Sequence, residues 1–280
     1  MIKRNGVEVM NARTKNVSIA KETIEICKNG QYTSVNGTVV DISQDLADAK
    51  LGTFYYPEGD AIEIFPSPPL LPIIEVTNET TQAAAIRLAS LGKMDIVALN
   101  FASARNQGGG FLSGAMAQEE ALCRNSGLYP CLKSKPLFYN ANILCDDCYY
   151  TDGIIYSPHV PFFRDEHNLL IDNPFTLSIV TAPAPNLNAA KDVDDDLLDA
   201  KFASRTTRIL EVAAAHGHKT LILGAWGCGA FGNDPTKVAN YFSDALQAVP
   251  MFEHVCFAVY DTRTPPLLFE AFDEVFVTVT

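Results

Sequence analysis

The chain has little positive charge: 21 Lys and Arg residues stand against 33 Asp and Glu residues, which gives a formal net charge of −12. No basic run is present that could neutralise the phosphates of a nucleic acid, so neither nonspecific nor sequence-specific nucleic-acid binding is expected. A polyanionic ligand would have to be held by local backbone N–H groups rather than by a basic surface.

Long apolar runs are also missing. No run approaches the roughly 18 apolar residues of a membrane-spanning helix, and the first residues lack the apolar core of a signal peptide. The seven cysteines are odd in number and scattered along the chain, which favours a reducing compartment over a disulfide framework. We therefore expect an intracellular protein, cytoplasmic or nuclear, without membrane attachment.

What the chain does contain is enough apolar sequence, 48%, for a substantial core. Its length of 280 residues favours one large domain. Strand-like runs alternate with helical ones, which predicts an α/β fold. Strands are expected at 38–42, 73–77, 95–101, 153–158, 175–182, 220–223, 254–260 and 275–279. Helices are expected at 18–29, 80–91, 114–123, 196–216 and 235–249, with packed or irregular loops at 52–72 and 129–152.

One stretch, from Asp95 to Tyr129, combines three features that suit anion chemistry. A strand-like run leads into three consecutive glycines, and a short helical pattern then carries two adjacent glutamates. Glycines between a strand and a helix let backbone N–H groups converge on a phosphate without a Cβ in the way. Taken alone, however, three glycines also suit a flexible turn, and adjacent glutamates often form a solvated helix face.

A second glycine-rich loop, from Gly224 to Asn233, follows another strand-like run and precedes a helix. In α/β sheets, ligands bind at the carboxyl ends of strands, where loops of separate βα units face one another. The glycines fit neither a Walker P-loop, because no Gly-Lys-Ser/Thr follows, nor a dinucleotide fingerprint, whose glycines are spaced.

Together these residues carry a resemblance. The string Gly108-Gly109-Gly110, seven residues and then Gln118-Glu119-Glu120 resembles the signature of poly(ADP-ribose) glycohydrolases, and the flanking NFASARNQ and ALCRNSGLY are similar to the microbial type. The second loop, GAWGCGAFGN, resembles that family's second phosphate loop. The resemblance implies a macrodomain-like fold, a three-layer α/β/α mixed sheet with an N-terminal helical extension. We expect the extension at 1–72 and the core at 73–280 of a single catalytic domain.

The resemblance also implies roles for particular residues. The catalytic pair would be Glu120, which matches the family's general acid, and Glu119, which would grip ribose hydroxyls. Ser103 and Asn106 would contact the terminal ribose, while Tyr260 would either stack on adenine or simply pack in the core. The remaining candidates would support the loops or bind the diphosphate and ribose, with Phe231 against the ribose: Gln118, Gly108, Gly109, Gly110, Gly227, Cys228, Gly229, Ala230, Phe231 and Gly232.

The implied reaction is hydrolysis of ribose–ribose O-glycosidic bonds from the end of poly(ADP-ribose), which releases ADP-ribose. One carboxyl group would protonate the leaving oxygen and then accept a proton from water, while the substrate diphosphate stabilises the oxocarbenium ion. Such an acid needs a raised pKa, which burial would favour. Two alternatives stay open: a macrodomain that binds ADP-ribose without cleaving it, and a hydrolase of another ADP-ribosyl conjugate.

No cofactor or metal is expected. The only CxxC, Cys145 to Cys148, has no second pair or matching histidines for zinc. The acidic residues around Asp194 read as a solvated helix entrance, and Cys228 lies far from any histidine in the sequence, which makes it a poor nucleophile. We expect a monomer whose partners are poly(ADP-ribose) or ADP-ribose and ADP-ribosylated proteins.

Overall fold

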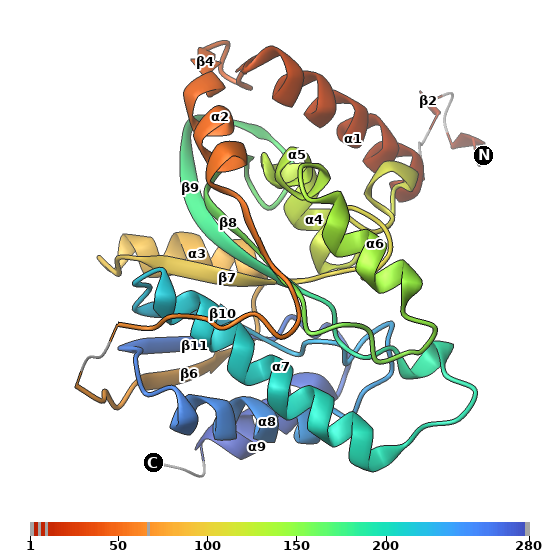
Figure 1. The fold of residues 1–280 in the computed structure, drawn as a ribbon. Coiled ribbons are helices and arrows are strands. Elements are labelled where there is room, and N and C mark those ends of the chain that lie inside the picture. The colour runs from red at the N-terminus through yellow and green to blue at the C-terminus, as the bar shows by residue number, and fades with distance from the viewer. Residues whose placement is uncertain (1–2, 5–6, 9–10, 66–67, 278–280) are drawn as a thin grey trace.

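The computed structural model describes residues 3–4, 7–8, 11–65 and 68–277. Its centre is a seven-stranded mixed sheet in the order β5-β8-β9-β7-β10-β11-β6 (Figure 1). Strands β9, β7, β10, β11 and β6 run parallel to one another, whereas β8 runs antiparallel to both of its neighbours. In sheet order the strands are β5 (Phe54–Tyr56), β8 (Ile154–Arg164), β9 (Leu170–Ala182), β7 (Ile96–Phe101), β10 (Thr220–Leu223), β11 (His254–Ala258) and β6 (Ile73–Thr77).

Helices cover both faces of the sheet, because successive strand residues point to opposite sides. Val97 and Leu99 belong to the core under one set of helices, while Ala98 between them belongs to the core under the other. The first set is α7 (Asp195–Ala215), α8 (Pro235–Ala248) and α9 (Leu267–Val277); the second includes α3 (Thr81–Ser90), α4 (Gln118–Asn125), α5 (Leu128–Lys133) and α6 (Pro136–Leu144). The expected three-layer α/β/α architecture is confirmed.

The N-terminal part adds α1 (Ala12–Asn29), α2 (Ser43–Gly52) and two small hairpins, β1 (Lys3–Arg4) with β2 (Val7–Glu8) and β3 (Gln31–Thr33) with β4 (Val39–Asp41). Helix α1 ends at Gly30 as expected, with φ +73°. It does not begin at Ser18: the side chain of Asn11 accepts from Thr14 N–H, so a polar turn extends the helix towards the N-terminus.

Four other expectations were wrong. Residues 129–152 hold two helices, because Pro136 starts α6 at its first turn instead of interrupting it. Residues 275–277 of the expected strand at 275–279 belong to helix α9, and 278–280 lie outside the described residues. The run is helical because Phe272 and Phe276, one turn apart, both pack against Phe257. The expected loop at 52–72 contains strand β5. The helix expected at 114–123 is α4, which begins only at Gln118, because Gly114, at φ +80°, ends a preceding 3-10 turn, η1 (Phe111–Ser113).

The topology brings the two glycine loops together. Strands β6 and β7, which follow one another in the chain, run parallel, but β10 and β11 lie between them. Strand β7, which leads to Gly108–Gly110, instead pairs with β10, which leads to the loop at 224–233. The carboxyl ends of these two neighbours therefore open onto the same edge of the sheet.

The proposed boundary between extension and core stays a prediction, although β5 from residues 1–72 pairs with β8 in the main sheet. Of the described helices, none combines the length and the apolar character needed to cross a bilayer.

Candidate active site

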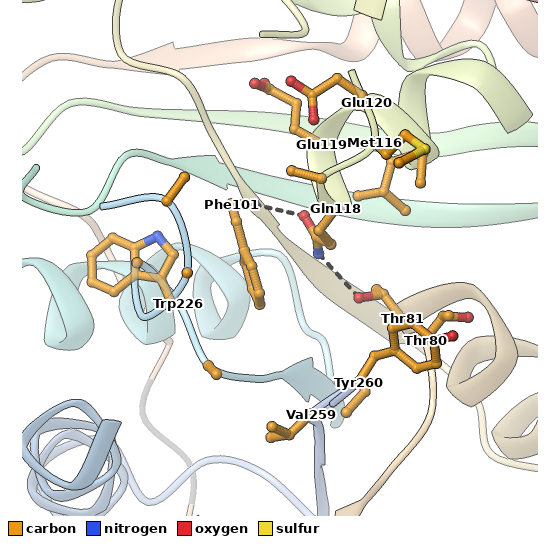
Figure 2. A pocket seen from close by; sticks show the side chains of 18 of the residues that line it. Thr80, Thr81, Phe101, Met116, Gln118, Glu119, Glu120, Trp226, Val259 and Tyr260 are labelled. Atoms are coloured by element: carbon orange, nitrogen blue, oxygen red, sulfur yellow. Dashed lines mark hydrogen bonds between the residues drawn. The ribbon is translucent and has the colours of Figure 1, made fainter. Parts of the chain in front are cut away.

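A cavity of about 490 Å³ lies at the carboxyl ends of β7, β10 and β11. Most of its walls come from the start of α3, the segment from the end of β7 through α4, the loop after β10, and the residues around Tyr260 after β11. Glu166, Ala184 and Leu268 complete the lining. Figure 2 shows Glu119 and Glu120 at one end of the view and Tyr260 with Val259 at the other, with Phe101 and Gln118 between them.

Gln118 fixes the start of α4 against the end of β7. Its Oε1 accepts from Phe101 N–H at 2.8 Å, and its Nε2 donates to Leu99 O at 2.7 Å and to Thr81 Oγ1 at 3.0 Å (Figure 2). The side chain thus pairs with both backbone groups that a neighbouring strand would use. Gln118 is therefore a positioning residue, which joins β7, α3 and α4 where the next two residues enter the cavity.

Both carboxylate oxygens of Glu119 are engaged. Oε2 accepts from Ser103 N–H at 2.8 Å and Oε1 from the side-chain amide of Asn100 at 3.1 Å. Only 2% of Glu119 is exposed, and this burial raises its pKa to about 8, partly opposed by the Ser103 and Asn100 hydrogen bonds. Burial thus favours the neutral form of this carboxyl group, and the two N–H donors favour the charged form.

Glu120 differs from its neighbour in having one carboxylate oxygen unused. Oε1 accepts from Gly110 N–H at 2.7 Å, whereas Oε2 is buried and has no hydrogen-bond partner among the described residues. The residue is 7% exposed and lines the cavity. A buried oxygen without a partner costs free energy unless something supplies one, so this atom is the natural contact for a ligand.

The three glycines leave room for different neighbours: a Cβ at Gly108 would lie 3.1 Å from Cys123 Sγ and one at Gly110 would lie 2.7 Å from Ala115 Cβ, whereas Gly109 lies against the carboxyl groups. A Cβ at Gly109 would stand 2.4 Å from Glu120 Oε1 and 3.0 Å from Glu119 Oε2, and Gly109 has φ +58°. The N–H groups of Gly109 and Gly110 are used internally, donating to Asn106 O and to Glu120. Within the described residues only Gly108, of the three, keeps an N–H without an acceptor.

The second loop offers more N–H groups. No described group accepts from the backbone N–H of Gly227, Gly229, Ala230 or Phe231, all of which line the cavity. A Cβ built at Gly229 meets no atom within 4 Å. Such a run of unused donors beside open space is the arrangement that binds phosphate oxygens.

The thiol of Cys228 is buried under the loop and is not a candidate for phosphate binding or nucleophilic attack. Its Sγ lies 3.6 Å from Trp226 O, the residue packs against the core, and burial raises its pKa far above the ordinary value. A protonated, buried thiol is a poor nucleophile, as the sequence also indicated.

The cavity has no positive charge in its walls. Among the described lining residues the charged side chains are Glu119, Glu120 and Glu166, without a Lys, Arg or His. An anion bound here would depend on backbone N–H groups. No three His, Cys, Asp or Glu side chains of the described chain gather closely enough to hold a metal ion.

Nine of the predicted residues line the cavity: Ser103, Gln118, Glu119, Glu120, Gly227, Gly229, Ala230, Phe231 and Tyr260. The other six belong to the same two loops without lining it: Asn106, Gly108, Gly109, Gly110, Cys228 and Gly232. The sequence reasoning missed Asn100, Phe101, Thr81 and Trp226. Asn100, a polar residue in the otherwise apolar strand β7, was the one available signal.

Comparison with known proteins agrees with this geometry. Residues 20–165 match the family model of the microbial-type PARG catalytic domain. No curated protein matches the chain. The poly(ADP-ribose) glycohydrolase of Thermomonospora curvata bound to the inhibitor ADP-HPD is 41% identical over 94% of this chain and 100% of that chain, with a TM-score of 0.86. The poly(ADP-ribose) glycohydrolase of Deinococcus radiodurans in complex with ADP-ribose is 40% identical over 84% of this chain and 98% of that chain, with a TM-score of 0.74.

Proposed function

The chain belongs to the microbial-type poly(ADP-ribose) glycohydrolase family, a glycosidase family that acts on poly(ADP-ribose), and from this premise we propose how it works. It hydrolyses the ribose–ribose O-glycosidic bond at the end of the polymer and releases ADP-ribose. Glu120 is the general acid and base, and residues 1–280 act as one catalytic domain, as a monomer.

The observation that carries this proposal is the difference between the two glutamates. Glu119 has both oxygens engaged by Ser103 and Asn100, whereas Glu120, which also lines the cavity, has a buried Oε2 without a partner among the described groups. Only Glu120 can exchange a proton with a ligand without first breaking a hydrogen bond. Glu119 is suited to orienting ribose hydroxyls from a fixed position.

The reaction then follows from one carboxyl group. Protonated Glu120 donates its proton to the oxygen of the leaving ribose as the bond to the anomeric carbon breaks. The carboxylate that remains accepts a proton from the attacking water, which restores the acid and gives a free anomeric hydroxyl. The bound diphosphate stabilises the positive charge that develops on the sugar.

Substrate binding is assigned to the remaining cavity walls. The N–H groups of Gly227, Gly229, Ala230 and Phe231 hold the diphosphate, with the Phe231 ring against the ribose. Tyr260, 62% exposed, is placed to stack on adenine at the far end. Burial raises the pKa of Glu119, which disfavours a full negative charge on this carboxyl group beside the diphosphate.

The test is a parallel incubation with purified poly(ADP-ribose) and with mono-ADP-ribosylated protein, followed by separation of products by size. The parent should shorten the polymer and release ADP-ribose. Glu120→Gln should lose turnover by orders of magnitude but keep ADP-ribose affinity, since the amide can still accept from Gly110 N–H.

Glu166→Gln is the matched control, because it makes the same chemical change elsewhere in the cavity wall and should retain activity. Normal turnover in Glu120→Gln would remove the mechanism. Binding of ADP-ribose without any cleavage by the parent would favour the non-catalytic reader, and cleavage of the protein conjugate alone would favour a different ADP-ribosyl linkage.

A further inference from the structure

In the second glycine loop, hydrogen bonds to carbonyl groups fix the orientation of peptide groups, and this orientation bears on which N–H groups stay unused. Residues 183–188, here called the support segment, run beside the loop. Backbone N–H groups of Leu187 and Asn188 donate to Phe231 O at 2.9 and 3.3 Å, and the Asn188 side-chain amide donates to Ala230 O at 2.9 Å. The carbonyls of Ala230 and Phe231 are thereby fixed towards the support segment.

A peptide group is planar, with its N–H and C=O pointing in opposite directions. Holding Ala230 O towards Asn188 therefore turns the N–H of Phe231 the other way. The peptide group between Gly227 and Cys228 is also held, because its N–H donates to Ala225 O. Gly227 O accepts from the side-chain amide of Asn233 at 2.9 Å, and the same amide donates to Pro185 O at 2.8 Å.

The support segment is itself held rigidly from below. Pro183 O accepts from Arg205, a fully buried arginine, at 2.7 Å, and the same guanidinium is paired with Asp152 at 2.8 Å. The loop also rests directly on the segment, because a Cβ at Gly227 would lie 2.5 Å from Ala184 Cβ. The segment can therefore fix the orientation of the peptide groups in the loop.

We propose that Asn188 is a positioning residue for substrate diphosphate: its amide, bonded to Ala230 O and lying over Gly232, keeps the N–H of Phe231 aimed into the cavity. This inference rests on the proposed function only for the identity of the ligand. Asn188 is exposed and does not line the cavity, so it acts through the loop rather than by touching substrate.

The test compares ADP with adenosine, since only ADP carries the diphosphate. Loss of one hydrogen bond in Asn188→Ala should weaken ADP binding by about three- to tenfold. Asn188→Asp should weaken it further, because a carboxylate would face Ala230 O. Adenosine affinity and the melting temperature should not change, whereas a merely structural role would lower both affinities and the melting temperature together.

Asn240→Asp is the matched control: Asn240 is also exposed, also donates to a backbone carbonyl, that of Thr236, and gains the same charge. It should bind ADP like the parent. With poly(ADP-ribose), the Asn188 variants should show a raised KM and nearly unchanged kcat. Equal ADP affinity in parent and Asn188→Asp, or equal losses at both asparagines, would overturn the proposal. A parent that binds ADP but cleaves no polymer would instead refute the proposed function and leave the binding comparison valid.

Discussion

Gly109→Ala should separate the placement of the catalytic carboxyl from every other contribution of the glycine loop. A Cβ at this position would stand 2.4 Å from Glu120 Oε1, whereas ordinary van der Waals contact begins at 3.4 Å. Glu120 would have to move by about 1 Å, and a displacement of that size at a reacting group can cost about a hundredfold in rate.

The backbone contributes a second effect, which can be measured separately. Gly109 has φ +58°, and a non-glycine residue in this region costs roughly 1–2 kcal/mol of stability. Gly217 has φ +77° but nothing within 4 Å of its hypothetical Cβ. Gly217→Ala therefore carries the same kind of strain without the clash, and the difference between the two variants isolates the effect on the two carboxyl groups, with the tighter contact at Glu120.

The assay is steady-state cleavage of poly(ADP-ribose), with melting temperature and ADP-ribose affinity measured on the same preparations. Both variants should melt at lower temperature than the parent, but only Gly109→Ala should lose kcat, by about a hundredfold. Affinity for ADP-ribose should fall far less. If Gly109→Ala kept full kcat, or if Gly217→Ala lost as much, the argument that glycine is required by the carboxyl groups would be wrong.

Two further predictions concern charge. No described side chain that lines the cavity is cationic, and the chain carries a net charge of −12. Raising the salt concentration from about 50 to about 200 mM should therefore leave ADP-ribose affinity unchanged or slightly increase it, because salt screens the repulsion. A tenfold weakening measured by calorimetry would contradict this. Glu119, with a pKa raised from 4.5 to about 8, contributes stability that is complete below pH 4.5 and is lost as pH rises through 8. At pH 9, the free energy of unfolding of Glu119→Gln, measured by denaturant titration, should therefore exceed that of the parent by at least about 1 kcal/mol. At pH 5 this difference should disappear. A difference that does not depend on pH would refute the prediction.

Local sequence patterns were sufficient for much of the fold. Strands 73–77 and 220–223 matched at both ends, because each is a short apolar run between clear turn or capping residues; 220–223 is buried, whereas 73–77 is a partly buried edge strand. Asp234 caps α8 as expected, since its side chain accepts from Lys237 N–H. Predictions of secondary structure failed where a local sequence pattern is compatible with two structures. Pro136 can end a helix or begin one, and the apolar run near Phe276 suits a strand or a buried helix until its packing against Phe257 is known.

For the site, the sequence by itself determined the chemistry available: two glycine loops, one Gln-Glu-Glu and almost no positive charge beside them. Only the tertiary structure decided which groups lie together and which hydrogen bonds distinguish Glu119 from Glu120. Pairing of β7 with β10 brings the loops together. Asn100 and Ser103 donate to both oxygens of Glu119, whereas Glu120 Oε2 is left without a partner among the described groups. The reason is that strand order and hydrogen-bond partners depend on packing between residues far apart in the chain, which a local pattern of residues does not encode.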